Sequence, residues 1–190
     1  MVVISKAFLK RIVFKLLEYS LNSASNEQGL SNLKIKLEQI VPDLSEQYTS
    51  FKIEGKYIVN KLRSLHAFQI DLAQAAISLL NHKRENITLV DIGDSSGTHL
   101  RYLQSLSGEG NIRAISVNLD PIAVDKIRRK GFEAIESRAE TLHNHPDFKG
   151  NADIFLSYEM VEHLLDPVSF LHAMATKSRS DYFVVTIPYL

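Results

Sequence analysis

The sequence of 190 residues has no cysteine, no tryptophan and no excess of charge of either sign. The lack of cysteine excludes a disulfide framework, a thiolate metal site and a cysteine nucleophile, and it is typical of a cytoplasmic protein. Because 22 basic residues balance 22 acidic ones, no overall positive field would draw the chain to nucleic acid. No apolar run approaches the roughly 20 residues of a membrane span, and no signal-peptide cleavage pattern follows the N-terminus. We therefore expect a cytoplasmic protein that neither crosses a membrane nor binds nucleic acid.

The chain is long enough, and at 45% hydrophobic content apolar enough, to bury one substantial core. Its first 85 residues predict only helices, over 5–21, 31–41 and 57–80, with a linker rich in Asn and Ser over 22–30. We expect this region, 1–85, to cap the functional site or to mediate dimerisation. His66 and Phe68, on the third helix, are candidates for a lid over the site.

The first predicted helix is amphipathic, with Lys6, Lys10 and Lys15 beside its apolar face. Helices of this kind usually pack against their own domain or a second subunit, and some lie on an anionic membrane surface. We expect packing against its own domain or against a second subunit in a homodimer, and keep peripheral membrane contact as the alternative. The apolar positions are Phe8, Leu9, Ile12, Val13, Leu16 and Leu17.

Beyond residue 85, short apolar runs alternate with helical segments, which is the pattern of βα units and of a parallel sheet. Residues 86–190 should therefore form a Rossmann-like α/β domain with a doubly wound parallel sheet. Strands are predicted over 88–92, 112–118, 132–136, 152–157 and 182–187, and helices near 99–106, 121–130 and 167–177.

The first of these strands runs directly into a turn of small residues and then a helix. Gly93 and Gly97, with Ser95 between them, allow a tight turn and a close approach of the backbone to a ligand. About 25 residues later, Asn118 and Asp120 end the second strand, where a sheet of this type meets a ribose hydroxyl. The pattern predicts a nucleotide-type cofactor loop.

Four motifs follow one another in order along residues 87–188. They are Asp91-x-Gly93-x-Ser95-x-Gly97, Val117-Asn118-Leu119-Asp120-Pro121, Ala139-Glu140-Thr141-Leu142, and the segment Ser157-Tyr158-Glu159-Met160-Val161-Glu162-His163 with Asp166-Pro167 after it. Together they resemble the class I S-adenosylmethionine-dependent methyltransferases, in particular those of types 11 and 12. The resemblance implies S-adenosylmethionine as methyl donor, S-adenosylhomocysteine as product, and the strand order 3-2-1-4-5.

The resemblance also implies a role for each matching residue. Asp91 would fix the glycine loop or reach the methionine amino group, and Gly93 and Gly97 would line the methionine and ribose end. Ala139 and Glu140 would lie beside the adenine. The other cofactor-binding residues that it assigns are Ser95, Asn118, Leu119, Ser157 and Tyr158, the last two facing the sulfonium and the acceptor.

Two positions depart from the family's pattern. Ser95 stands where the family usually has glycine, although a small side chain still permits close approach. Asn118 stands where the family usually has a carboxylate for the ribose hydroxyls, and an amide accepts more weakly, so Asp120 would then assist. The alternative of a non-catalytic binding or interaction module stays open, as does a simple capping role for Asp91. A nicotinamide dehydrogenase is disfavoured, because its Gly-x-Gly-x-x-Gly motif would need glycine at Ser95 and Thr98.

Glu159 and His163 are the candidate catalytic residues, because a carboxylate or an imidazole can take a proton from an acceptor near neutral pH. For His163 the alternative is that it braces the chain after the fourth strand. His143 and His145 alternate in a loop that offers no third and fourth ligands, so no metal is expected.

The family's sheet usually has seven strands and only five are predicted here, so we expect a truncated domain whose fifth strand needs cover. The acceptor is expected to be a small molecule or a saccharide, since no basic arm or aromatic groove for nucleic acid is visible. A similarity to methyltransferases of surface-saccharide biosynthesis points the same way. It rests on Leu65-His66-Ala67-Phe68-Gln69 and on Ile187-Pro188-Tyr189.

Overall fold

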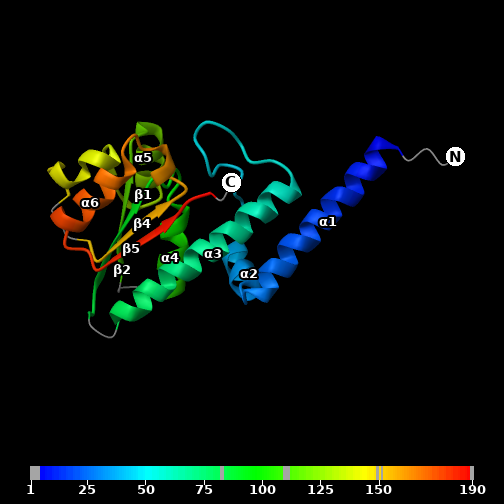
Figure 1. Cartoon of the computed structure of the whole chain (residues 1–190), viewed down its shortest axis with the longest axis horizontal. Coiled ribbons are helices and arrows are strands. Elements are labelled where there is room, and N and C mark those ends of the chain that lie inside the picture. Colours follow the sequence, from blue (N-terminus) through cyan, green and yellow to red (C-terminus); the bar gives the residue numbers. More distant parts are fainter. Residues whose placement is uncertain (1–4, 82–83, 109–111, 149, 151, 189–190) are drawn as a thin grey trace.

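The computed structural model describes residues 5–81, 84–108, 112–148, 150 and 152–188, so Tyr189 of the terminal motif lies outside the described residues. Figure 1 shows a twisted sheet with helices on both faces, and the first helix, α1 (Lys6–Glu27), extending away from it. The short helix α2 (Ser31–Ile40) packs against the two long helices of the N-terminal region, α1 and α3 (Lys56–Asn81). The predicted all-helical N-terminal region is confirmed.

Helix α1 continues over residues 22–27, where the linker was predicted, so that prediction was wrong. The reason is a tertiary contact. Ser25 is only 5% exposed, and its hydroxyl donates to the Leu21 carbonyl oxygen at 2.8 Å and to the Ser64 hydroxyl of α3 at 3.3 Å. Packing against α3 therefore overrides the weak helix preference of Asn and Ser. The chain turns away only at Gly29, which has a φ of 72°.

The sheet has the predicted strand order, β3-β2-β1-β4-β5, and neighbouring strands pair in parallel. Chain order reverses beside β1, so the connections from β1 and β4 leave in opposite directions. In sheets of this kind ligands bind at the carboxyl ends of the strands beside such a point. The strands are β1 (Ile87–Ile92), β2 (Ile112–Asn118), β3 (Glu133–Glu136), β4 (Ile154–Tyr158) and β5 (Tyr182–Thr186).

Helices cover both faces of the sheet (Figure 1). On one face α3 and α4 (Thr98–Ser107) share a hydrophobic core with the strands, and on the other α6 (Pro167–Lys177) and the 3₁₀ helix η1 (Ala139–Asn144) do so. Helix α5 (Pro121–Arg129) packs against β2 and β3, and the short 3₁₀ helix η2 (Val161–His163) follows β4. Since α3 shares a core with the strands, the domain boundary at residue 85 stays a prediction.

The buried side chain of Arg63 joins three helices, α2, α3 and α4. It projects from α3 and is 2% exposed. Its Nη1 donates to the Leu37 carbonyl oxygen at 3.2 Å and to the Tyr102 hydroxyl of α4 at 3.0 Å. Its Nη2 donates to the Pro42 carbonyl oxygen at 2.8 Å and also to that of Val41. A cation therefore satisfies carbonyl groups at and beyond the C-terminal end of α2.

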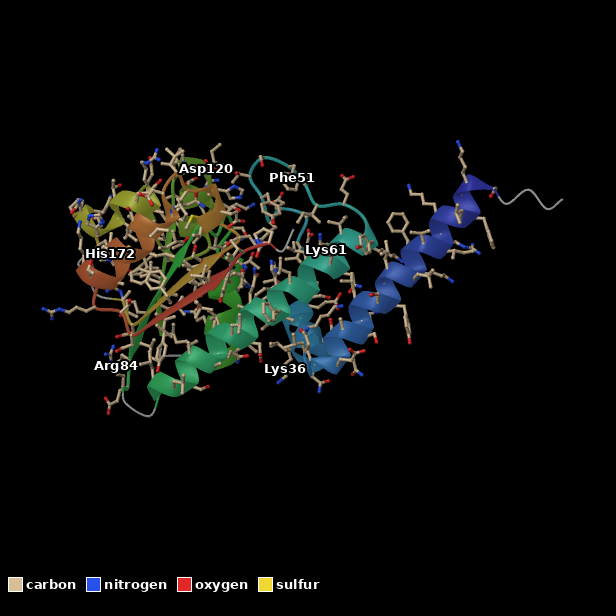
Figure 2. All side chains as sticks on the ribbon, in the orientation of Figure 1. Lys36, Phe51, Lys61, Arg84, Asp120 and His172 are labelled. Carbon is tan, nitrogen blue, oxygen red and sulfur yellow. The ribbon has the colours of Figure 1, made fainter. Side chains whose placement is uncertain are left out.

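Replacement of Arg63 by methionine should lower the free energy of unfolding by about 2–4 kcal/mol, because buried carbonyl groups lose their donors. Arg63→Lys should cost nearly as much, since one ammonium cannot reproduce the planar fork of donors. Lys61→Met, on the exposed side of the same helix (Figure 2), should change stability by less than about 0.5 kcal/mol. Urea unfolding followed by circular dichroism measures all three. Equal effects of the Arg63 and Lys61 variants on stability would contradict the role of Arg63 in joining the helices.

Candidate functional site

The turn between β1 and α4 depends on the buried carboxylate of Asp94. Its Oδ1 accepts from the backbone N–H of Ser96 and its Oδ2 from that of His99, each at 3.1 Å. Asp94 therefore satisfies one N–H group within the turn and one in the first turn of α4. Gly97, with a φ of 71°, immediately precedes this helix. The capping role that was open for Asp91 thus belongs to Asp94.

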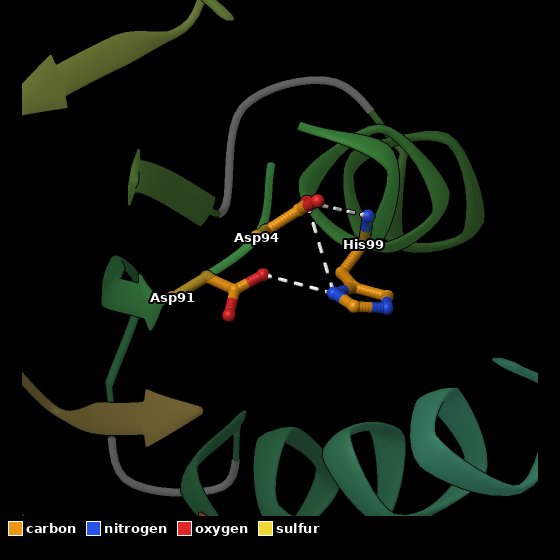
Figure 3. Close-up of side chains that lie close together, drawn as sticks. All are labelled: Asp91, Asp94 and His99. Atoms are coloured by element: carbon orange, nitrogen blue, oxygen red, sulfur yellow. Dashed lines mark hydrogen bonds and ion pairs between the residues drawn. The ribbon is translucent and has the colours of Figure 1, made fainter. Parts of the chain in front are cut away.

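Asp91, at the end of β1, is paired with a histidine instead. Its Oδ2 lies 3.2 Å from Nδ1 of His99, and the same nitrogen is 3.7 Å from Oδ2 of Asp94 (Figure 3). Both partners are buried, at 1% and 7% exposure. Among the described residues, Oδ1 of Asp91 and Nε2 of His99 have no hydrogen-bond partner. An unpaired carboxylate oxygen in a buried position is costly, and it is a natural acceptor for a ligand's donor.

Burial sets the electrostatics of this group. It raises the pKa of Asp91 to about 6, although the nearby His99 opposes the shift. Burial lowers the pKa of His99, but Asp94 and Asp91 outweigh it and leave that pKa raised. His66 packs edge-on against His99, with ring centres 5.0 Å apart, and burial lowers the pKa of His66 well below its usual value. A neutral imidazole thus lies beside a charged pair.

Asp91, Asp94 and His99 each offer a ligand atom, and these atoms lie within 4.8 Å of one another. The oxygens of Asp94 already accept two backbone N–H groups, and Oδ2 of Asp91 faces the imidazole. The three atoms that face one another are therefore engaged within the cluster rather than arranged as an open ligand set, and we continue to expect no metal.

Two hollows meet at Gly93, at the carboxyl ends of the strands. The larger, of about 290 Å³, lies at the ends of β1 and β2 and beside η1. It brings together six of the predicted residues, Gly93, Asn118, Leu119, Ala139, Glu140 and His163. The smaller, of about 90 Å³, lies between the β1 turn, the end of β4 and α3. It contains four of them, Gly93, Ser95, Tyr158 and Glu159, together with Gln47, Tyr48, Leu62, Leu65, His66, Gln69, Asp94 and His99.

Gly93 is necessary between these hollows for two reasons. Its φ of 102° is strained for any residue with a side chain. A Cβ atom built there would lie 2.7 Å from Cγ of Met160, closer than van der Waals contact allows. The backbone of the turn is therefore held against the chain that follows β4.

Other predicted residues lie outside the two hollows. Gly97 precedes α4, and Asp91 lies beneath the β1 turn. Ser157 is fully buried, and its side chain alternates along β4 with that of Tyr158, so it points to the opposite face of the sheet. Tyr158 does reach the smaller hollow, and its hydroxyl donates to the Gln69 carbonyl oxygen at 2.9 Å.

Asn118 lines the larger hollow, but its side chain is already engaged twice. Its Nδ2 donates to the Asp94 carbonyl oxygen at 3.2 Å, and its Oδ1 accepts from the Asp120 N–H at 2.9 Å. The carboxylate of Asp120 in turn accepts from the Ile122 N–H at 2.9 Å and from the Thr49 hydroxyl at 2.7 Å. The loop before α3 thus lies beside Asp120, as the position of Phe51 in Figure 2 illustrates. Asp120 caps α5 and anchors this loop.

The two candidate catalytic residues belong to different hollows. Glu159 follows β4 with a φ of 51°, a left-handed conformation that is uncommon outside glycine, and its N–H donates to the Thr186 carbonyl oxygen at 2.9 Å. It lines the smaller hollow. His163 lines the larger one, and its side chain is 76% exposed. Strained backbone of this kind clusters at functional sites, which makes Glu159 the stronger candidate.

Sequence reasoning missed Gln47, Gln69 and His99 as residues of the site. Gln47 is buried, and its Oε1 accepts from the hydroxyls of Ser96 at 3.0 Å and Thr98 at 2.6 Å. It comes from a loop without periodicity, so no signal was available. Gln69 and His99 carried a signal that we did not use, because each is a polar residue on the buried side of an amphipathic helix.

The two residues predicted to form a lid, His66 and Phe68, lie in different surroundings in the structure. His66 is buried in the smaller hollow, whereas Phe68 is 41% exposed and lies outside both hollows. Residues two apart on a helix do not share a face. A lid role therefore stays a prediction for His66 alone.

No protein-family model matches the sequence, and no curated protein is similar to it in sequence. Several solved structures are similar in fold. The sugar N-methyltransferase KedS8 from Streptoalloteichus sp has a TM-score of 0.50 at 15% identity, over 75% of this chain and 59% of its own. The plantazolicin methyltransferase BpumL, solved with S-adenosylhomocysteine, has a TM-score of 0.49 at 13% identity, over 87% and 56%. A methyltransferase from Aquifex aeolicus has a TM-score of 0.41 at 16% identity, over 58% and 66%.

This chain spans less than two thirds of the length of the similar solved structures. At such low identity the similarity concerns the fold. Together with the strand order, it shows that the chain has the Rossmann-like fold of the class I methyltransferases.

Gly93→Ala should lower the free energy of unfolding by about 2–4 kcal/mol, because it adds backbone strain to a clash with Met160. Gly29→Ala is the matched control, since its φ is 72° and no atom lies within 4 Å of the added Cβ. It should cost only about 1 kcal/mol. Urea unfolding of both variants measures the difference. If Gly93→Ala were no more destabilising than Gly29→Ala, the close contact with Met160 would be refuted.

Proposed function

We propose that this chain binds S-adenosylmethionine and takes part in methyl transfer to a small-molecule or saccharide acceptor. The observation that carries the proposal is the junction of two hollows at Gly93, two residues after Asp91, whose buried Oδ1 has no partner among the described residues. This junction lies at the topological switch point of a parallel sheet, where such folds bind nucleotides. The order of the four sequence motifs supports the same cofactor.

The two hollows suit the two ends of this cofactor. In the proposal the adenosine occupies the larger hollow, with Ala139 and Glu140 beside the adenine and Asn118 and Leu119 near the ribose. The methionine end reaches the smaller hollow past Gly93. Asp91 lines neither hollow, but it precedes Gly93 by two residues, and its buried Oδ1 has no hydrogen-bond partner among the described residues. A carboxylate oxygen of this kind fits an ammonium donor, so in the proposal it accepts from the amino group of the methionine end.

S-adenosylmethionine supplies, when bound, an electrophilic methyl group on a sulfonium. The chain's own contribution is to hold an acceptor close to that methyl group and to exclude water. Tyr158 and His66 would shape the wall of the smaller hollow, where both are buried. Glu159, at the same hollow, would take the proton that the acceptor loses. His163 would stay at the adenosine side and take no part in that step.

Two observations support a small-molecule or saccharide acceptor, namely the volume of the smaller hollow and the similarity in fold to KedS8. The smaller hollow, of about 90 Å³, receives the methionine end in this proposal, so only a small reacting group of the acceptor enters it. The similar fold of KedS8, whose name describes a sugar N-methyltransferase, is in keeping with a saccharide. We infer a cytoplasmic setting, because the proposed cofactor is a soluble metabolite.

Calorimetric titration with S-adenosylhomocysteine tests the cofactor. We expect binding to the wild-type chain and its loss in Gly93→Arg, because a long side chain at that turn would fill the junction. Gly29→Arg places the same side chain at a positive φ far from the site, and it should bind like the wild type. Binding without methyl transfer to any sugar, amine or hydroxyl acceptor would favour a non-catalytic module. Absence of binding by the folded wild type would overturn the proposal.

The affinity for S-adenosylhomocysteine should depend on pH through Asp91. Its pKa of about 6 means that acid protonates the carboxylate and removes the acceptor for the ammonium group. Affinity should therefore fall as pH drops below 6, by up to about tenfold per unit. Asp91→Asn should bind more weakly at pH 7.5 and lose most of this dependence. A wild-type affinity that is the same at pH 5 and pH 7.5 would contradict the role of Asp91.

A further inference from the structure

Helix α1 exposes an unusual amount of apolar surface. Leu9, Leu16 and Tyr19 are 55%, 63% and 73% exposed. Among the described residues, α1 packs against α2 and α3, and its N-terminal half extends beyond the rest of the molecule (Figure 1). A contiguous exposed apolar patch of this size marks an interaction surface. The patch consists of Phe8, Leu9, Ile12, Val13, Leu16, Leu17 and Tyr19.

The apolar patch lies on the side of α1 that faces away from α3. Ser25 marks the opposite side, since its hydroxyl bonds to Ser64 of α3. Leu16 precedes Ser25 by nine residues, which at about 3.6 residues per turn is two and a half turns. Leu16 and Ser25 therefore point in opposite directions, and Leu9 lies close to Leu16 on the outer side. Phe14 is set apart from the patch, because it packs against Tyr57 with ring centres 5.6 Å apart.

The charges beside the patch are all positive. The chain has no acidic residue before Glu18. On a helical projection Arg11 and Lys15 border one side of the patch, and Lys6 and Lys10 border the other. All four are exposed. Long cationic side chains that flank an apolar face can reach outward to anionic groups while their stems cover apolar surface.

This charge pattern discriminates between partners. A second copy of the chain would bring a second set of cations against the first, with no acidic residue within 5–17 to pair with them. An anionic lipid surface accepts the apolar side chains and pairs with the cations at the same time. No helix among the described residues is long and apolar enough to cross a membrane, so such a contact would lie in the plane of the surface.

We propose that α1 docks the protein on an anionic lipid bilayer, with the apolar patch inserted at the level of the headgroups. The site around Gly93 belongs to other elements, namely the β1 turn and the strand ends. Docking by α1 would therefore hold the protein at a membrane without occupying that site. The proposal does not depend on the identity of the cofactor.

The test is sedimentation of the full chain with lipid vesicles. We expect at least tenfold more binding to phosphatidylcholine vesicles that contain phosphatidylserine than to phosphatidylcholine alone, and a decrease as salt is added. Leu9→Asp should reduce binding at least tenfold. Ile35→Asp is the matched control, because Ile35 on α2 is also 55% exposed, and it should bind like the wild type. Far-ultraviolet circular dichroism verifies that each variant is folded.

Charge is tested in the same assay. Lys10→Gln combined with Arg11→Gln should abolish the preference for anionic vesicles, whereas Lys36→Gln on α2 (Figure 2) should preserve it. Equal binding to neutral and anionic vesicles, or no binding to either, would overturn the proposal. So would a concentration-dependent dimer in analytical ultracentrifugation that Leu9→Asp dissociates, since the partner would then be a second copy of the chain.

Discussion

The buried carboxylate of Asp94 is the constraint on which the candidate site depends. Its two side-chain oxygens accept from the N–H of Ser96 in the turn and from that of His99 in the first turn of α4, and its backbone carbonyl accepts from Asn118 at the end of β2. One residue thus joins the β1 turn, the next helix and the neighbouring strand. Because Asp94 accepts from these N–H groups, Asp91 has no capping role, and one of its oxygens has no partner among the described residues. In the proposed function, ligand binding depends on these different roles of two carboxylates, eight and five residues before His99.

Burying two carboxylates close to one imidazole removes charged groups from water. This desolvation lowers the free energy of unfolding. Burial raises the pKa of Asp91, so the folded chain holds its proton more tightly than the unfolded chain does. Stability that depends on this proton is present below the unfolded pKa and is lost as pH rises through about 6. Sites that accept such a cost are often functional. Binding of an ammonium group would offset part of this loss of stability. Ligand binding would therefore stabilise the β1 turn.

The sheet could be predicted from the sequence because its signals are local. Helix α6 begins and ends where predicted, since Asp166 caps its first turn and Pro167 follows at the first helical position. The end of α1 could not be predicted, because it depends on the contact of Ser25 with Ser64, 39 residues away. Likewise the motifs indicated the region of Gly93, but not the contribution of Gln47. Its bonds to Ser96 and Thr98 join segments that no periodicity connects.

Asn118 shows how a departure from a family's pattern can have a structural reason. A carboxylate at this position could accept from the Asp120 N–H, but it could not donate to the Asp94 carbonyl oxygen. The amide does both, at 2.9 Å and 3.2 Å, and so holds the β1 turn against the end of β2. Its oxygen keeps a second lone pair, which leaves one acceptor for a ribose hydroxyl where a carboxylate would offer more. In the proposed function, Asn118 therefore binds the ribose less strongly than a carboxylate would, but it makes the β1 turn more rigid. That turn positions Gly93 between the two hollows.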